Sequence, residues 1–317
     1  MADFLIDTDT ASDDAVALIL ALRSPGVTVR GVTVVAGNVN LQQATRNACH
    51  VAELCGHDAP VHAGVASPLI RQAEDATWFH GRDGLGDRGF APSRRTATDM
   101  HAVDAMLELS RQHPDLTLVT LGPLSNVAAA VHRDPTFASR IGRCVVMGGN
   151  PCCVGNVTPA AEYNIWCDPE AAAIVFRSGM PIDLVGWQLS RDDAVWSVAD
   201  VAAVRAIDTP LARFAVDCNA VAADAYEKQT GQPGIALPDA VAMAIAIDPS
   251  IVTHASSHKV QVECASSLTR GQTVVDQLNS AADPRLAADW SHAGPPMGVI
   301  WSIDIARYKA MLLDAVR

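Results

Sequence analysis

Strand-like apolar runs alternate with helix-like runs through the first 190 residues of this 317-residue chain. FLIDT precedes a helical pattern that we expect to begin at about Asp13, with Ser12 as its N-cap. VTVRGVTVVAG is rich in β-branched residues, and LQQATRNACHVAELCG reads as a helix that ends at Gly56. LTLVTLG with LSNVAAAVH, CVVMGG with DPEAAAIVFRSG, and then PIDLVG continue the alternation. Such βα repetition predicts an α/β fold with a mostly parallel sheet flanked by helices.

The last third of the chain reads differently. Helical patterns dominate a segment of about 190–235, including one helix over 209–229, and a further helix begins near Asp239. Strand-like KVQVEC and MGVIWSI follow, and a closing helix covers 303–316. Because no low-complexity linker or internal repeat interrupts the chain, we expect one domain over 1–317 with a helical insertion.

The longest interval without a helix or strand pattern is about 64–98, which contains FHGRDGLGDRGF. A loop of this length inside a compact domain is typically a functional lid or binding loop, so we expect it to be mobile. The formal net charge of −12 argues against nucleic acid or an anionic membrane as a partner. No long apolar run, no basic leader and no CxxC pair are present, from which we expect a cytoplasmic protein with reduced thiols.

Four aspartates, Asp7, Asp9, Asp13 and Asp14, lie within DTDTASDD, directly after the first predicted strand. Asp13 and Asp14 would complement the dipole of the helix that they open, but that role does not explain Asp9 beside them. Clustered carboxylates repel one another unless a cation compensates them, and a hard divalent cation such as calcium prefers such oxygen ligands. In α/β sheets, ligands bind beyond the carboxyl ends of the strands, where Asp9 would lie.

Two families are similar to this segment. DTDTA resembles the DxDx[TV] signature of haloacid dehalogenase-type phosphatases, except that Ala11 stands where threonine or valine belongs. DTDTASDDAVAL resembles more closely the DxDxxxDDxxA opening of the inosine–uridine-preferring nucleoside hydrolases. VVAGNVNLQQATRNA, FHGRDGLGD, TLGPLSNVA, VMGGN with GNVTPAAEYNIWCDPEAA, and PDAVAMAIAIDP resemble further blocks of that family, in family order. The chain is identified as a member of the nucleoside hydrolases, and the resemblance implies their eight-stranded, mostly parallel sheet.

The resemblance also implies a site and a reaction. Calcium, one ion per subunit, would be bound by Asp9, Asp14, Asp239 and the main-chain carbonyl of Leu121. Asp9 would be the general base for a water that attacks the anomeric carbon as the N-glycosidic bond breaks. The ribose-binding positions match Asp13, Asn38, Asn156, Glu162 and Asn164, with GGNPCCVGN one residue longer than the commonest spacing before Asn156. The implied substrate is a ribonucleoside, and the implied assembly is a homodimer or homotetramer.

The base side departs from the family pattern. Many relatives carry a histidine immediately before the last metal aspartate, whereas this chain has Leu237 and Pro238. The base-side candidates are therefore His80 in the 64–98 loop, Trp78 beside it and Trp187 at a strand end, although a tryptophan there is usually a core residue. Stacking on tryptophan would slightly favour purine nucleosides. The missing histidine also leaves open a second hypothesis, a nucleoside-binding protein with weak or no turnover.

Overall fold

The computed structural model describes all 317 residues, and eight strands form one central sheet in the order β3-β2-β1-β4-β5-β6-β10-β7. The strands are β1 (Ala2–Thr8), β2 (Val27–Val34), β3 (Val61–Ala63), β4 (Leu116–Thr120), β5 (Ile141–Met147), β6 (Ile182–Val185), β7 (Val252–His258) and β10 (Met297–Ile303). Every neighbouring pair is parallel except β10 and β7, which are antiparallel. The predicted α/β fold with one eight-stranded, mostly parallel sheet is confirmed.

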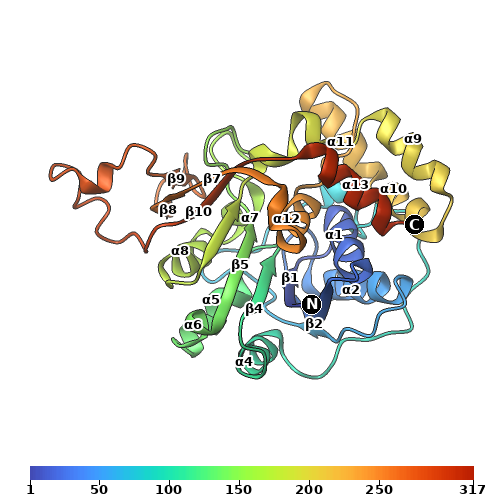
Figure 1. Ribbon diagram of the computed structural model, residues 1–317, viewed down its shortest axis with the longest axis horizontal. Helices are drawn as coiled ribbons and strands as arrows, with labels where there is room; N and C mark the ends of the chain where they lie inside the picture. Colours follow the sequence, from blue (N-terminus) through green and yellow to red (C-terminus); the bar gives the residue numbers. More distant parts are fainter.

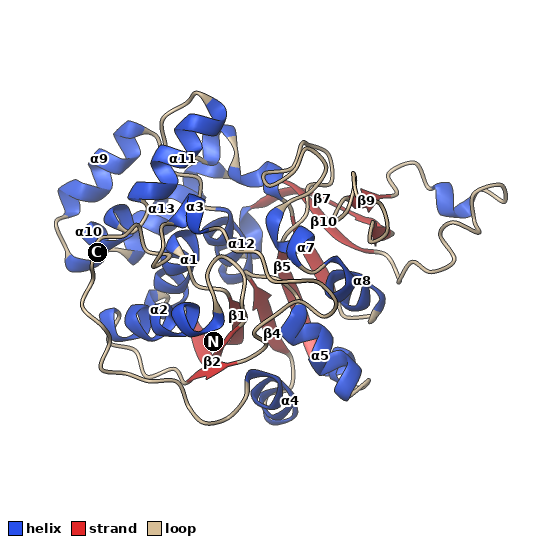
Figure 2. Cartoon of the chain, turned by 180° about the vertical axis from the view of Figure 1, so that it is seen from behind, coloured by secondary structure: helices blue, strands red, loops and turns tan.

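Helices cover both faces of this sheet (Figures 1 and 2). They are α1 (Ser12–Arg23), α2 (Leu41–Leu54), α3 (Thr77–His80), α4 (Ala102–Gln112), α5 (Ser125–Arg133), α6 (Phe137–Arg140), α7 (Tyr163–Cys167), α8 (Pro169–Arg177), α9 (Val198–Ile207), α10 (Pro210–Asp217), α11 (Ala220–Thr230), α12 (Pro238–Ile247) and α13 (Ile305–Ala315). Helices α1, α2, α12 and α13 share one apolar core with Phe4 and Ile6 of β1. Leu5, between them, faces a second core with α4, α5 and α8, as the alternation of side chains along a strand requires.

The central helix α1 explains why two carboxylates can be buried. Its residues from Ser12 to Leu22 are all buried, because α1 packs against the sheet, α2 and α12 at once. The side chains in its first turn, Asp13 and Asp14, are therefore buried with it. The helix begins at Ser12 with Ala11 as N-cap, one residue earlier than expected, and the Asp14 carboxylate accepts a hydrogen bond from the Ala11 N–H at 2.8 Å.

The order of the strands predicts a ligand-binding crevice at the carboxyl ends of β1 and β4. The chain passes from β1 outward to β2 and β3 and then returns to β4 on the other side of β1. Loops that follow β1 and β4 consequently diverge at the carboxyl ends of these strands, which is where α/β sheets bind ligands. The Leu121 N–H, just after β4, donates to the Asp7 carbonyl at 2.7 Å, so the two strand ends are joined directly.

Two sequence expectations need correction. The expected helix over 209–229 is two helices, α10 and α11, separated at Cys218 and Asn219. The Asn219 side-chain amide donates to the Ala215 carbonyl at 2.9 Å and to the Ser12 carbonyl at 3.2 Å, so contacts with α1 accompany the break. The edge strand β7 was not predicted either, because its mostly polar sequence, VTHASSH, lacks the apolar alternation of a half-buried strand.

The remaining segments have little regular structure. Residues 64–98 contain only the short helix α3, and the helices α9, α10 and α11 fall within the segment expected to be a helical insertion. Strands β8 (Val260–Val262) and β9 (Thr273–Val275) form a separate pair, and the chain after them extends away from the body before it returns through β10 (Figure 1). None of the helices combines the length and apolar character needed to cross a membrane.

Candidate active site

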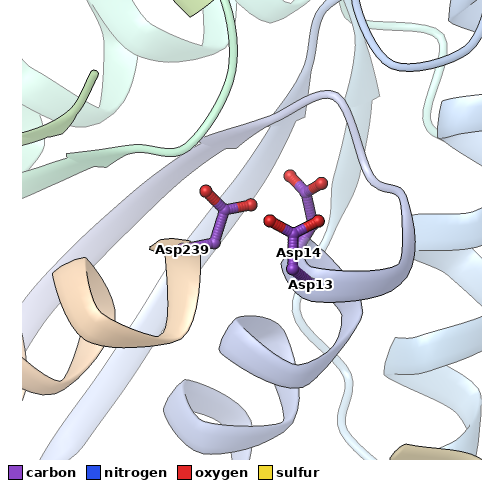
Figure 3. A group of neighbouring side chains, drawn as sticks. All are labelled: Asp13, Asp14 and Asp239. Carbon is purple, nitrogen blue, oxygen red and sulfur yellow. The ribbon is translucent and has the colours of Figure 1, made fainter. Parts of the chain in front are cut away.

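Three buried carboxylates converge at the carboxyl end of β1. Asp13 and Asp14 project from the first turn of α1, and Asp239 faces them from the first turn of α12 (Figure 3). One carboxylate oxygen of each lies within 4.8 Å of the other two. The chain brings together groups that are 225 residues apart because α1 and α12 pack side by side on one face of the sheet.

Asp9, on the loop between β1 and α1, lies close enough to Asp13 and Asp14 for their charges to affect its own. Its Oδ2 accepts a hydrogen bond from the Asn38 N–H at 2.6 Å, whereas its Oδ1 is buried and has no partner. Glycines on both flanking loops make room for this carboxylate. A Cβ added at Gly37 would lie 2.8 Å from Asp9 Cγ, and one added at Gly122 would lie 2.7 Å from Asp9 Oδ1.

The electrostatics of the four aspartates require compensation. Burial, and then the negative charge of neighbouring carboxylates, raises the pKa values of Asp9, Asp14 and Asp239. Burial raises the pKa of Asp13 to about 6. No lysine or arginine forms an ion pair with any of them. Four such groups cannot all be ionised in this environment unless a positive charge joins them.

The donor set fits a hard metal ion. Only oxygen atoms are offered, and the buried oxygens Asp9 Oδ1 and Asp13 Oδ1 lack any hydrogen-bond donor. Asp14 is held in place by the Thr8 hydroxyl, which donates to its Oδ1 at 2.6 Å, and by the Ala11 N–H. The acidic cluster could therefore hold a metal ion.

A pocket opens in front of the carboxylates. Asp9 and Asp14 lie behind its wall, whereas every other predicted site residue lines it: Asp13, Asn38, Trp78, His80, Leu121, Asn156, Glu162, Asn164, Trp187 and Asp239. These residues come from seven separate loops or short helical segments. The structure thus gathers the whole predicted set around one cavity, including Asn156, whose loop has the unusual spacing.

The polar end of the pocket is rigidly built. Glu162 caps α7 by accepting from the Asn164 N–H at 2.9 Å, and it also accepts from the Gly149 N–H at 2.8 Å. Asn164 donates its side-chain amide to the Leu121 carbonyl at 2.7 Å. Asn156 Oδ1 accepts from the Tyr163 N–H at 2.8 Å, which holds the Asn156 side chain at the pocket that this residue lines. Burial raises the pKa of Glu162 to about 7.

Comparisons with known proteins agree with this arrangement. The family model described as "Inosine-uridine preferring nucleoside hydrolase" matches residues 4–310. A probable uridine nucleosidase 1 of Oryza sativa subsp. japonica is 34% identical over 98% of this chain and 95% of its own length. The inosine-uridine preferring nucleoside hydrolase of Leishmania major is 36% identical over 86% of this chain and 87% of its own. The chain belongs to the inosine-uridine preferring nucleoside hydrolase family.

Solved nucleoside hydrolases share the whole fold. A plant nucleoside hydrolase superposes with a TM-score of 0.93 at 34% identity, covering 99% of this chain and 98% of that one. A purine-preferring ribonucleoside hydrolase from Gardnerella vaginalis gives a TM-score of 0.89 at 31% identity, with coverage of 99% and 98%. Members of this family are enzymes that act on N-glycosyl compounds, so these findings favour a hydrolase over both a phosphatase and a binding protein without turnover.

The residues expected on the base side of this nucleoside hydrolase are mainly apolar and aromatic. Leu237 is buried, and Pro238 begins α12 and lines the pocket. Trp187 is buried in a cluster with Tyr226 and also lines the pocket, whereas Trp78 is 54% exposed at the pocket's edge. A tryptophan at the end of β6 therefore has both the core role and the pocket position that the sequence offered as alternatives.

His80 is not a surface residue. It is 6% exposed, its Nδ1 lies 2.8 Å from the Ser12 hydroxyl, and the same nitrogen lies 3.7 Å from Asp13 Oδ1. Burial lowers the pKa of His80 to about 4, so the ring is neutral near pH 7. In this environment His80 is poorly suited to hold a proton for donation.

Sequence reasoning missed several residues that line the pocket, among them Phe79, Met147, Tyr163 and Gln229. Phe79 and Tyr163 are neighbours in sequence of predicted site residues, so their position in the chain could have indicated that they line the pocket. Gln229 gave no such signal, because it reaches the pocket from α11, ten residues before Asp239, through the packing of helices.

Proposed function

We propose that this nucleoside hydrolase binds one calcium ion per subunit and hydrolyses the N-glycosidic bond of ribonucleosides to ribose and a free nucleobase. The observation that carries the proposal is the convergence of buried carboxylates, two of them with unpartnered oxygens, behind a pocket lined by polar side chains. Oxygen-only donors suit calcium, and the pocket combines polar side chains with apolar and aromatic ones, as sites for small molecules do. We also propose a cytoplasmic homodimer or homotetramer.

Asp9, Asp14, Asp239 and the Leu121 carbonyl would hold the ion. When bound, calcium supplies positive charge that compensates the carboxylates, orients sugar hydroxyls and makes a water more acidic. The Leu121 carbonyl accepts from the Asn164 amide at 2.7 Å and keeps a second lone pair free for a cation.

Asp13, Asn38, Asn156, Glu162 and Asn164 would bind the ribose. Asp13 belongs to the carboxylate group but, unlike Asp9 and Asp14, it lines the pocket, so its unpartnered Oδ1 can accept from a sugar hydroxyl. The backbone N–H groups that hold Glu162 fix its position before the substrate arrives. Negative charge on Asp13 and Glu162 would stabilise the cationic sugar of the transition state more than the neutral ground state.

Asp9 would be the general base. Its Oδ2 is occupied by the Asn38 N–H, so Oδ1 is the atom left to take a proton from the attacking water. An ionised carboxylate beside the attacking water can take its proton as a general base. Proton transfer to Oδ1 would accompany attack of the water on the anomeric carbon as the bond to the base breaks.

Purine nucleosides would be slightly favoured. Trp187, Trp78 and Phe79 offer aromatic surface on the base side, and a purine has the larger ring system to stack on it. No histidine lies immediately before Asp239, and the neutral, buried His80 is a poor acid. A purine base, which can take a proton from solvent at N7, would therefore leave more readily than a pyrimidine base. The relatives include both a uridine nucleosidase and a purine-preferring hydrolase.

A reducing-sugar assay on a panel of nucleosides tests this proposal. Metal-free protein should release no ribose, and added calcium should restore release and raise the melting temperature by mass action, more than magnesium does. The rates of ribose release from inosine, guanosine, adenosine, uridine and cytidine give the order of preference for the base. Nucleoside binding by calorimetry without ribose release would support a binding protein instead, and undiminished turnover after complete chelation would refute the metal site.

A further inference from the structure

Asn47 joins two loops of the site from behind. It lies on α2, is 3% exposed, and its side-chain amide donates to the Thr10 carbonyl at 2.9 Å and to the Asp83 carbonyl at 2.8 Å. Thr10 is in the aspartate loop (residues 8–14), and Asp83 is in the glycine turn (residues 81–87) that follows His80. Gln43, one turn earlier on α2, donates to Asn47 Oδ1 at 2.9 Å and fixes the orientation of the amide.

The glycine turn is a preformed unit. Its N–H groups at Gly84 and Gly86 donate to the carbonyls of Gly81 and His80, and the Asp83 carboxylate accepts from the Leu85 and Asp87 N–H groups. Such a unit moves as one body, so a tether at one carbonyl positions the whole turn. Gly84, with a φ of +72°, approaches so closely that an added Cβ would lie 3.1 Å from Asn47 Nδ2.

The position of the turn determines where His80 lies. The Gly86 N–H holds the His80 carbonyl at 2.9 Å, and the His80 ring contacts the Ser12 hydroxyl of the aspartate loop. The turn and the aspartate loop are therefore connected at two points: through the contact between Ser12 and His80, which lines the pocket, and through Asn47. Asn47 itself does not line the pocket.

We propose that Asn47 is a positioning residue, which fixes the glycine turn against the aspartate loop so that the pocket wall around His80 and Asp13 is formed before substrate binds. This inference rests on the proposed hydrolase site, but its structural part can be measured without turnover. Loss of the Asn47 amide would leave two carbonyls without their shared donor and would release the turn from the loop.

Three variants on α2 separate positioning from general stability. Asn47→Ala removes both tethers. Gln43→Ala keeps them and removes only the bond that orients the amide. Val51→Ala removes buried side-chain volume from the same helix, one turn further on, and removes no hydrogen bond to either loop, so it controls for destabilisation.

Hydrogen exchange in calcium-loaded protein is the first measurement. In Asn47→Ala we expect the Gly84 and Gly86 amides to exchange about tenfold faster or more, while strand amides of β1 and β4 keep their protection. Val51→Ala should leave the glycine turn protected, and Gln43→Ala should have an intermediate effect. Unchanged exchange at Gly84 and Gly86 in Asn47→Ala would overturn the proposal even if the protein is an active hydrolase.

Steady-state kinetics on a nucleoside that the wild type hydrolyses is the second measurement. Misplacement of a binding wall by about 1 Å can cost about 10²-fold, so we expect kcat/KM of Asn47→Ala to fall about 10- to 100-fold, chiefly through KM. Val51→Ala should keep the wild-type kcat and KM below its melting temperature. Equal losses in the two variants at matched stability would show a merely structural role. A wild type without turnover would refute the hydrolase proposal. The hydrogen-exchange result would still show whether Asn47 fixes the glycine turn against the aspartate loop.

Discussion

Replacement of Gly37 by alanine tests whether the position of Asp9 controls the reaction. Gly37 needs no positive φ, so alanine fits its backbone, but the new Cβ would lie 2.8 Å from both Asp9 Cγ and the Pro123 ring. Asp9 Oδ2 is the atom nearest to the new Cβ, and because ordinary van der Waals contact begins at 3.4 Å, the Asp9 carboxyl group must move by about 1 Å or more. The movement also disturbs the 2.6 Å hydrogen bond from the Asn38 N–H.

A displacement of about 1 Å at a catalytic group can cost about 10²-fold in rate, so kcat of Gly37→Ala should fall about 10- to 100-fold. The assay is ribose release at saturating nucleoside and calcium, with the melting temperature recorded for each variant. Gly122→Ala approaches the same carboxylate from the other side, with its Cβ 2.7 Å from Asp9 Oδ1, and should also lower kcat. Gly26→Ala meets no atom within 4 Å and is the matched control. Wild-type kcat in folded Gly37→Ala and Gly122→Ala would refute the reasoning about Asp9.

Three further predictions concern the chemistry. Asp9→Asn should lower kcat by about 10²-fold or more because it removes the proton acceptor, and an unchanged kcat would exclude Asp9 as the base. Inosine should be preferred over 2′-deoxyinosine by up to about 10⁴ in kcat/KM, since a site built around a hydroxyl rejects the analogue that lacks it; comparable values would contradict the proposed sugar contacts. p-Nitrophenyl riboside, whose leaving group needs little protonation, should be cleaved much faster than inosine or uridine. Equal rates would reveal an effective acid in this protein, and His80→Gln would then be the first variant to make.

Much of the fold could be predicted because its signals are local. The β-branched runs and the amphipathic helices report on burial within a few residues, so the alternation that builds the sheet was readable. The same locality made Asp9, Asp13 and Asp14 readable as a cluster, since they lie on one loop. The resemblance then supplied Asp239, which no local pattern connects to that loop.

Tertiary structure decided what depends on distant neighbours. The break between α10 and α11 lies where the Asn219 amide contacts Ser12, 207 residues away, and nothing in the sequence around Cys218 marks it. Strand β7 exists because the antiparallel partner β10 completes its hydrogen bonds, although VTHASSH has no strand pattern of its own. The sequence by itself determined which residues carry the acidic charge and the polar groups. Only the packing of α1 against α12 put Asp239 beside Asp14, and only the position of α2 put the Asn47 amide between two site loops, because both contacts depend on how whole elements stack across the sheet.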